Sequence, residues 1–251
     1  MISFFGNQCL RDAVVGRVRE HQRLDQIAQR IYWDGSKGCA IGCVLHSGEH
    51  MAFEEQLGLP VFLAYMDEHI FESLPLVEAK AWPLRFIEAV PVGVDLELVF
   101  PRFMHWLLSD PDGMRQYANA DTLPIIDSLT EMYERRIEGI PFDTDRATSI
   151  ARAADNAADR ATDKATARAA NATNAAAWAT NAAARPVWAG GRAAWAADAA
   201  RAAGNAADRA ASTNRQADYL IALLRGYESN PVEGPPCTEQ ERALGFAAVQ
   251  P

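Results

Sequence analysis

The segment from Lys37 to Leu57, KGCAIGCVLHSGEHMAFEEQL, gathers more residues capable of chemistry than any other part of the chain. It holds two of the four cysteines, two of the five histidines and three carboxylates. A helix starting at residue 38 would place its thiols and imidazoles on one face, at spacings of four, three and four: Cys39, Cys43, His46 and His50. This face is the first candidate for a functional site.

Cys39 is a candidate catalytic nucleophile. It follows the turn Gly35–Gly38 and would lie in the first turn of its helix, where the helix dipole and the nearby Lys37 favour the thiolate. His46 would lie two turns along the same helix, too far away to act as the base for Cys39. A cysteine-dependent hydrolase would therefore need a histidine from another part of the chain.

His46 and His50 are candidate metal ligands, because histidines four residues apart on a helix can share one ion. One straight helix cannot bring all four side chains to a single ion, so neighbouring helices would have to contribute. The candidates for metal or ligand contacts there are His21, Asp25 and Glu54, and His69 and Glu72 could also serve as metal ligands. No cofactor is predicted, although a divalent metal could bind. The same pattern also fits a buried helix face on which cysteine packs as a small hydrophobic residue.

Residues 1–142 are expected to form an all-α, multi-helix globular head that positions this segment. Apolar residues at helical spacing predict a helix over 11–33, followed by helices over 38–46, 49–57 and 60–72, and a further helix over 123–138. Strand patterns are scarce in this part of the chain.

Residues 143–226 form an alanine-rich region, called the arm below, in which 34 of 84 residues are alanine. Alanines recur in alternating threes and fours, which predicts helices over 147–184 and 192–211 that pack through alanine faces as a long hairpin. Arg185-Pro186 and Gly190-Gly191 mark the expected bend. Such faces let helix axes approach to about 8 Å. The arm could equally join two copies into a homodimer. The proline-containing tail, 227–251, is expected to be irregular.

Charge and hydropathy exclude several classes of partner. The net charge of −9 resides in the head, where no basic cluster is available for a nucleic acid. No apolar run reaches the length of a membrane span, and no secretory signal is recognisable. We therefore expect a cytoplasmic protein that binds neither nucleic acid nor membrane.

Several motifs resemble a group of uncharacterised proteins from phages and prophages. They are WDGSKGCAIGCVLH at residues 33–46, ExxLGLP, IFESLP, VDL and FxxWLL, followed by the alanine-rich region. The resemblance implies a mobile-element context. It implies no established activity and assigns no catalytic residue.

Two functions follow as hypotheses. The first is a non-enzymatic helical interaction protein of mobile-element type, with an anti-defence or immunity-like role, that binds a protein partner or sequesters a small ligand. The second is a metal- or cysteine-dependent hydrolase centred on Cys39, His46 and His50. Because no recognisable catalytic set accompanies these residues, the first is preferred.

Overall fold

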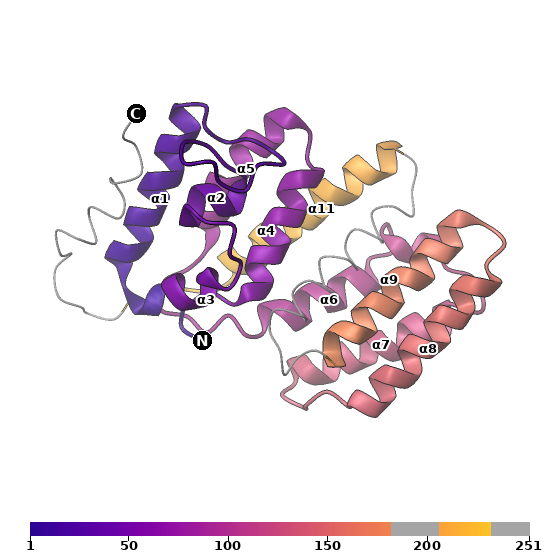
Figure 1. Cartoon of the computed structure of the whole chain (residues 1–251). Coiled ribbons are helices and arrows are strands. Elements are labelled where there is room, and N and C mark those ends of the chain that lie inside the picture. The colour runs from indigo at the N-terminus through magenta and orange to yellow at the C-terminus, as the bar shows by residue number, and fades with distance from the viewer. Residues whose placement is uncertain (182–205, 232–251) are drawn as a thin grey trace. The chain divides into compact units, whose positions relative to one another are not determined.

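The structure is a computed structural model that describes residues 1–181 and 206–231 (Figure 1). These residues are helical, with no β-strand among them, and the prediction of an all-α fold is confirmed. The helices are η1 (Ser3–Gly6), α1 (Gln8–Arg23), α2 (Ala40–Leu45), α3 (Ala52–Leu57), α4 (Val61–Ser73), α5 (Leu76–Ala89), α6 (Val99–Ser109), η2 (Met114–Tyr117), α7 (Leu123–Ile137), α8 (Thr144–Arg160), α9 (Lys164–Asn181) and α11 (Ala206–Arg225).

The chain divides into two compact units. The first unit comprises Met1–Glu97 together with the chain from Leu220 onward, and the second comprises Leu98–Tyr219. The boundaries therefore fall before α6 and within α11, whereas the sequence suggested a boundary after residue 142. The alanine-rich helices α8 and α9 share their unit with α6 and α7.

The first unit has a core of large side chains. Helix α1 packs against α2 and α5, and α4 packs against α2, α3 and α5. The largest fully buried side chains of this unit include Trp82, Phe53, Phe71 and Phe86. Burying a side chain of this size contributes about 1.5–3 kcal/mol, so a few residues supply much of the stabilisation.

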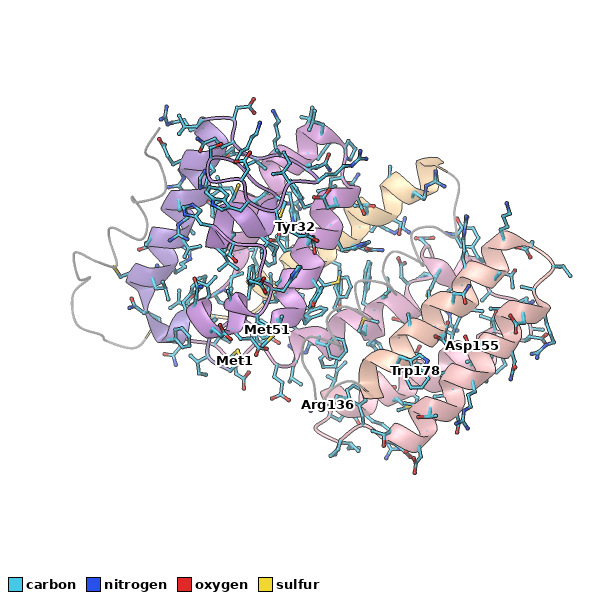
Figure 2. All side chains as sticks on the ribbon, viewed as in Figure 1. Met1, Tyr32, Met51, Arg136, Asp155 and Trp178 are labelled. Atoms are coloured by element: carbon cyan, nitrogen blue, oxygen red, sulfur yellow. The ribbon has the colours of Figure 1, made fainter. Side chains whose placement is uncertain are left out.

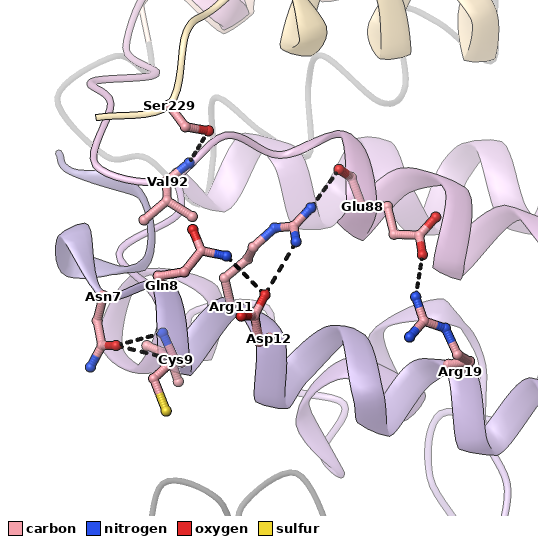
Figure 3. Close-up of polar contacts among 10 residues, drawn as sticks. Asn7, Gln8, Cys9, Arg11, Asp12, Arg19, Glu88, Val92 and Ser229 are labelled. Atoms are coloured by element: carbon pink, nitrogen blue, oxygen red, sulfur yellow. Dashed lines mark hydrogen bonds and ion pairs between the residues drawn. The ribbon is translucent and has the colours of Figure 1, made fainter. Parts of the chain in front are cut away.

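Polar contacts fix α1 in the first unit (Figure 3). The Asn7 side chain caps the helix by accepting from the backbone N–H groups of Cys9 and Leu10 at 2.9 and 3.1 Å. Arg11 donates to the Glu88 carbonyl at 2.9 Å, and Arg19 pairs with the Glu88 carboxylate at 2.7 Å. Helices α1 and α5 are therefore held together by hydrogen bonds as well as by packing.

The second unit contains a helical hairpin, but not the one expected. The predicted helix over 147–184 is interrupted: α8 ends at Arg160, α9 begins at Lys164, and the two helices pack side by side as an antiparallel pair (Figure 1). Asp163 explains the break, because its carboxylate accepts from the backbone N–H and the hydroxyl of Thr166, both at 2.8 Å. This is an N-terminal cap, and it starts a new helix within the alanine pattern.

Small residues form the interface between α8 and α9. The buried positions include Ala151, Ala154 and Ala157 on α8 and Ala169, Ala172 and Ala176 on α9. Figure 2 labels Asp155 on α8 and Trp178 on α9. Asn174 of α9 donates to the Ala151 carbonyl of α8 at 2.9 Å, and the Tyr133 hydroxyl of α7 donates to the Ala176 carbonyl of α9 at 2.8 Å.

Some predictions concern residues outside the described ranges. The expected bend at 185–191, most of the predicted helix over 192–211 and most of the tail lie there. Residues 206–211 belong to α11, whose apolar end is buried at Leu220, Ile221 and Leu224. Among the described residues, no helix combines the length and apolarity that crossing a membrane requires.

Candidate functional site

The Lys37–Leu57 segment does not form the single face that its spacing suggested. Helix α2 ends at Leu45, because His46 adopts a left-handed conformation with φ of 55°. Helix α3 begins only at Ala52, so His50 lies in the connection between the two helices. Cys39 and Cys43 remain on α2, while His46 and His50 turn to different partners.

Two glycines allow the backbone at Tyr32 to pack closely against α2. A Cβ atom on Gly38 would lie 2.3 Å from the Tyr32 carbonyl oxygen, and one on Gly42 would lie 1.7 Å from it. The N–H of Cys39 donates to the same carbonyl at 3.2 Å. The spacing Gly-Cys-x-x-Gly therefore places the loop carrying Ile31 and Tyr32 directly over the start of α2.

His21 and His46 form a hydrogen-bonded pair. Their Nε2 atoms are 2.9 Å apart, and Nδ1 of His21 lies 2.7 Å from Oε1 of Gln26. Since a carbonyl oxygen only accepts, His21 carries its proton on Nδ1, and His46 Nε2–H donates to His21 Nε2. Trp33 stacks on His46, with ring centroids 4.3 Å apart.

Both histidines of this pair are neutral at pH 7. Burial lowers the pKa of His46 to about 4, and the positive charge of Arg17 acts in the same direction. Burial also lowers the pKa of His21, although the hydrogen bond to Gln26 opposes this. Arg17 itself is buried and donates to the Val44 carbonyl at 2.7 Å. The pair joins α1 to the end of α2.

The thiol of Cys39 is not activated, contrary to the sequence-based expectation. Its residue is 1% exposed, and burial raises the pKa of the thiol to about 11. Backbone N–H groups at the start of α2 favour the thiolate but do not outweigh burial, and the carboxyls of Asp67 and Glu68 oppose ionisation further. Cys43 is more strongly affected, since burial raises its pKa to about 12. Both cysteines are free thiols.

Cys39 nevertheless borders a pocket of about 180 Å³ in the first unit. This pocket, called the Cys39 pocket below, has six lining residues: Arg30, Ile31, Tyr32, Cys39, Glu68 and Glu72. They come from the loop after α1, the N-terminus of α2 and the C-terminal half of α4. The volume suits a small molecule and lies below the range typical of drug-sized ligands.

Glu68 is held as an acceptor on the pocket wall. Burial disfavours its ionisation, but the 2.6 Å hydrogen bond from His50, the electrostatic effects of His50 and His69, and the hydrogen bond from Tyr32 together outweigh burial and lower its pKa. His50 in turn stacks on Tyr65, with centroids 4.3 Å apart. His50 therefore orients a pocket carboxylate and does not join His46.

Glu72 is the second carboxyl group of the pocket. Its two oxygens accept from the Arg30 backbone N–H at 2.9 and 3.2 Å. Burial raises its pKa, the Arg30 hydrogen bond offsets part of this, and the nearby charge of Glu68 adds to the increase. The two carboxyls lie one helical turn apart on α4.

Two further predicted site residues lie elsewhere. The predicted helix over 11–33 ends at Arg23, and Asp25 sits in a left-handed turn where its exposed side chain pairs with Lys80. Glu54 accepts from the Val61 N–H at 3.1 Å, so it caps the start of α4. In the part of the chain that the structure describes, no group of three or more His, Cys, Asp or Glu side chains is placed to hold a metal ion.

On α4 the sequence suggested His69 and Glu72 as possible ligands, but it did not suggest Glu68. The pair Glu68 and Glu72, four residues apart on one helix, was an available signal, because like charges at that spacing repel. The exposed Tyr32, whose hydroxyl reaches Glu68, was not anticipated. Comparisons with family models, curated proteins and solved structures found no match to this chain.

Proposed function

We propose that this protein is a non-enzymatic binding protein that sequesters a small polar ligand in the Cys39 pocket. The observation that carries the proposal is the pocket itself, whose wall combines an aromatic ring, an apolar side chain and two carboxyl groups: Tyr32, Ile31, Glu68 and Glu72. Binding sites commonly combine apolar surface with a few fixed polar groups in this way.

The protonation states of Cys39 and Glu68, which line the pocket, favour binding over catalysis. A hydrolase would need a nucleophile at Cys39, but the raised pKa keeps that thiol protonated at neutral pH. Glu68 is a poor general base, because the hydrogen bonds that lower its pKa also reduce its affinity for a proton. Groups held in this way serve better as fixed hydrogen-bond acceptors.

The proposal is tested by recovering the ligand with the full-length protein. Purified protein is incubated with the small-molecule extract of the cells that express it, separated from unbound compounds, denatured and analysed by mass spectrometry. We expect one small compound at a stoichiometry near one, and its loss from an Ile31→Phe variant whose ring fills the pocket. Ala211→Leu, an exposed change on α11, serves as the control. Equal retention by the wild type and Ile31→Phe would refute the proposal.

A further inference from the structure

Within residues 1–181 and 206–231, neither carboxyl group of the Cys39 pocket forms an ion pair with a lysine or arginine side chain. Among the described residues, the only ion pair of Glu68 is with His50, and Glu72 has none. The donors that reach Glu72 and Glu68 are the Arg30 backbone N–H, the Tyr32 hydroxyl and the His50 ring. Arg30 lines the pocket and its positive charge lowers the pKa of Glu72, but it forms no ion pair with either carboxylate.

The spacing of Glu68 and Glu72 makes the ionisation of both carboxyl groups together unfavourable. Glu68 and Glu72 are four residues apart on α4, and like charges at that spacing destabilise a helix. The raised pKa of Glu72 reflects the charge of Glu68 in addition to burial. A cation placed between the two groups would remove this repulsion and allow both to ionise fully.

A third carboxyl group lies behind the pocket wall and is not one of its lining residues. Asp67 precedes Glu68 on α4 and is fully buried, and it is near enough to Cys39 to affect the pKa of the thiol. Its Oδ1 accepts from the Trp82 indole N–H at 2.7 Å, whereas Oδ2 has no hydrogen-bond partner. Burial raises the pKa of Asp67 well above its ordinary value, so this carboxyl group is neutral and adds no negative charge beside Glu68.

We propose that the ligand of the Cys39 pocket carries a compact organic cation, a guanidinium or primary ammonium group, which Glu68 and Glu72 bind together. This inference rests on the proposed function and adds the chemical class of the ligand. A guanidinium group offers several N–H donors and could contact both carboxylates at once. The Tyr32 ring at the pocket wall would add an aromatic face for the cation.

The test compares two probes of nearly the same shape and different charge. Methylguanidinium and methylurea are titrated into the full-length protein at low ionic strength, and their binding is followed by NMR chemical-shift changes. We expect methylguanidinium to bind at least tenfold more tightly than methylurea, and its affinity to fall at least fivefold in Glu68→Gln and in Glu72→Gln. Glu55→Gln, an exposed change on α3, should leave the affinity unchanged.

Three results would overturn the inference. Methylurea could bind as tightly as methylguanidinium, or the two glutamine variants could bind methylguanidinium as well as the wild type does. Magnesium chloride could displace methylguanidinium more strongly than sodium chloride does at equal ionic strength, which would assign the pocket to an inorganic cation.

Failure of this inference is distinguishable from failure of the proposed function. If the extract experiment yields a neutral or anionic compound whose binding Ile31→Phe abolishes, the pocket binds a ligand and only its cationic class is wrong. If neither probe binds and no compound is retained, both proposals fail.

Discussion

The two units of this protein are stabilised in different ways. The first unit buries large aromatic side chains and depends on a few close contacts, such as that between the Tyr32 backbone and Gly42. The α8–α9 hairpin of the second unit buries mainly alanine, and each methyl group contributes little area. A single substitution should therefore disrupt the first unit severely at a few positions, whereas the hairpin should lose stability in smaller steps.

The largest effect is expected for Gly42→Ala. The added Cβ would lie 1.7 Å from the Tyr32 carbonyl oxygen, a backbone atom that cannot move without displacing the loop over α2. We expect a loss of more than about 3 kcal/mol in the free energy of unfolding, measured by urea denaturation.

A matched glycine provides the control. Gly16 lies on an exposed face of α1, and a Cβ there would have no neighbour within 4 Å. Because alanine has a higher helix propensity, Gly16→Ala should increase stability by about 0.5–1 kcal/mol. Similar effects of the two substitutions would show that the close contact at Tyr32 does not stabilise the fold.

Acid should destabilise the first unit through His46. Its pKa is about 4 in the folded protein, compared with an ordinary value of 6.5, so between these pH values the unfolded chain binds a proton that the folded chain does not. The contribution is fully present above pH 6.5 and is lost as the pH falls to 4. We expect this loss to be roughly 2–3 kcal/mol.

A variant isolates this contribution from that of the carboxylates. Asparagine also tolerates the left-handed conformation at position 46 but does not titrate, so His46→Asn should show a shallower decrease in stability between pH 6.5 and pH 4. The measurement is urea denaturation across this range. Parallel curves for the two proteins would contradict the prediction.

A smaller loss is expected in the alanine interface. Ala172 is fully buried on α9, and leucine there would force α8 and α9 apart, at a cost of about 1–3 kcal/mol. Ala211→Leu, on an exposed part of α11, should change the melting temperature little. If the two substitutions have equal effects, α8 and α9 do not pack through this face.

The smallest effect is expected at the hairpin turn. Asp163→Ala removes the cap of α9 and should cost about 1 kcal/mol, measured by thermal denaturation. Asp155→Ala, at an exposed position on α8, is the control and should be close to neutral. An equally small effect of both changes would mean that the turn does not depend on this cap.

Helical spacing in the sequence was sufficient to predict the fold class but not the details of the site. The alanine period continues unbroken over residues 154–183, which favoured one long helix, although Asp163 and Thr166 carried a capping signal. His46 ends α2 in a left-handed conformation, so the one-face arrangement with His50 does not form. The pairing of His21 with His46 brings together two predicted site residues, but spacing alone does not reveal it.

The role of Gly38 and Gly42 was also hidden in the sequence. In a sequence, glycines at these positions indicate a flexible backbone or the end of a helix. In the structure they leave space for the backbone of Tyr32. This close approach depends on the loop that contains Tyr32, and the apolar spacing within α2 does not reveal where that loop lies. The Cys39 pocket follows from this contact, because the same loop supplies Ile31 and Tyr32 to its wall.

The most direct test of the account is a map of backbone amide chemical shifts in the full-length protein during titration with methylguanidinium. The account predicts that the changes centre on residues 30–32, 39–42 and 68–72, that the amides of α8 and α9 are unaffected, and that Glu72→Gln suppresses the changes. Shift changes centred on α8 and α9, or an unchanged pattern in Glu72→Gln, would contradict the assignment of ligand binding to the Cys39 pocket.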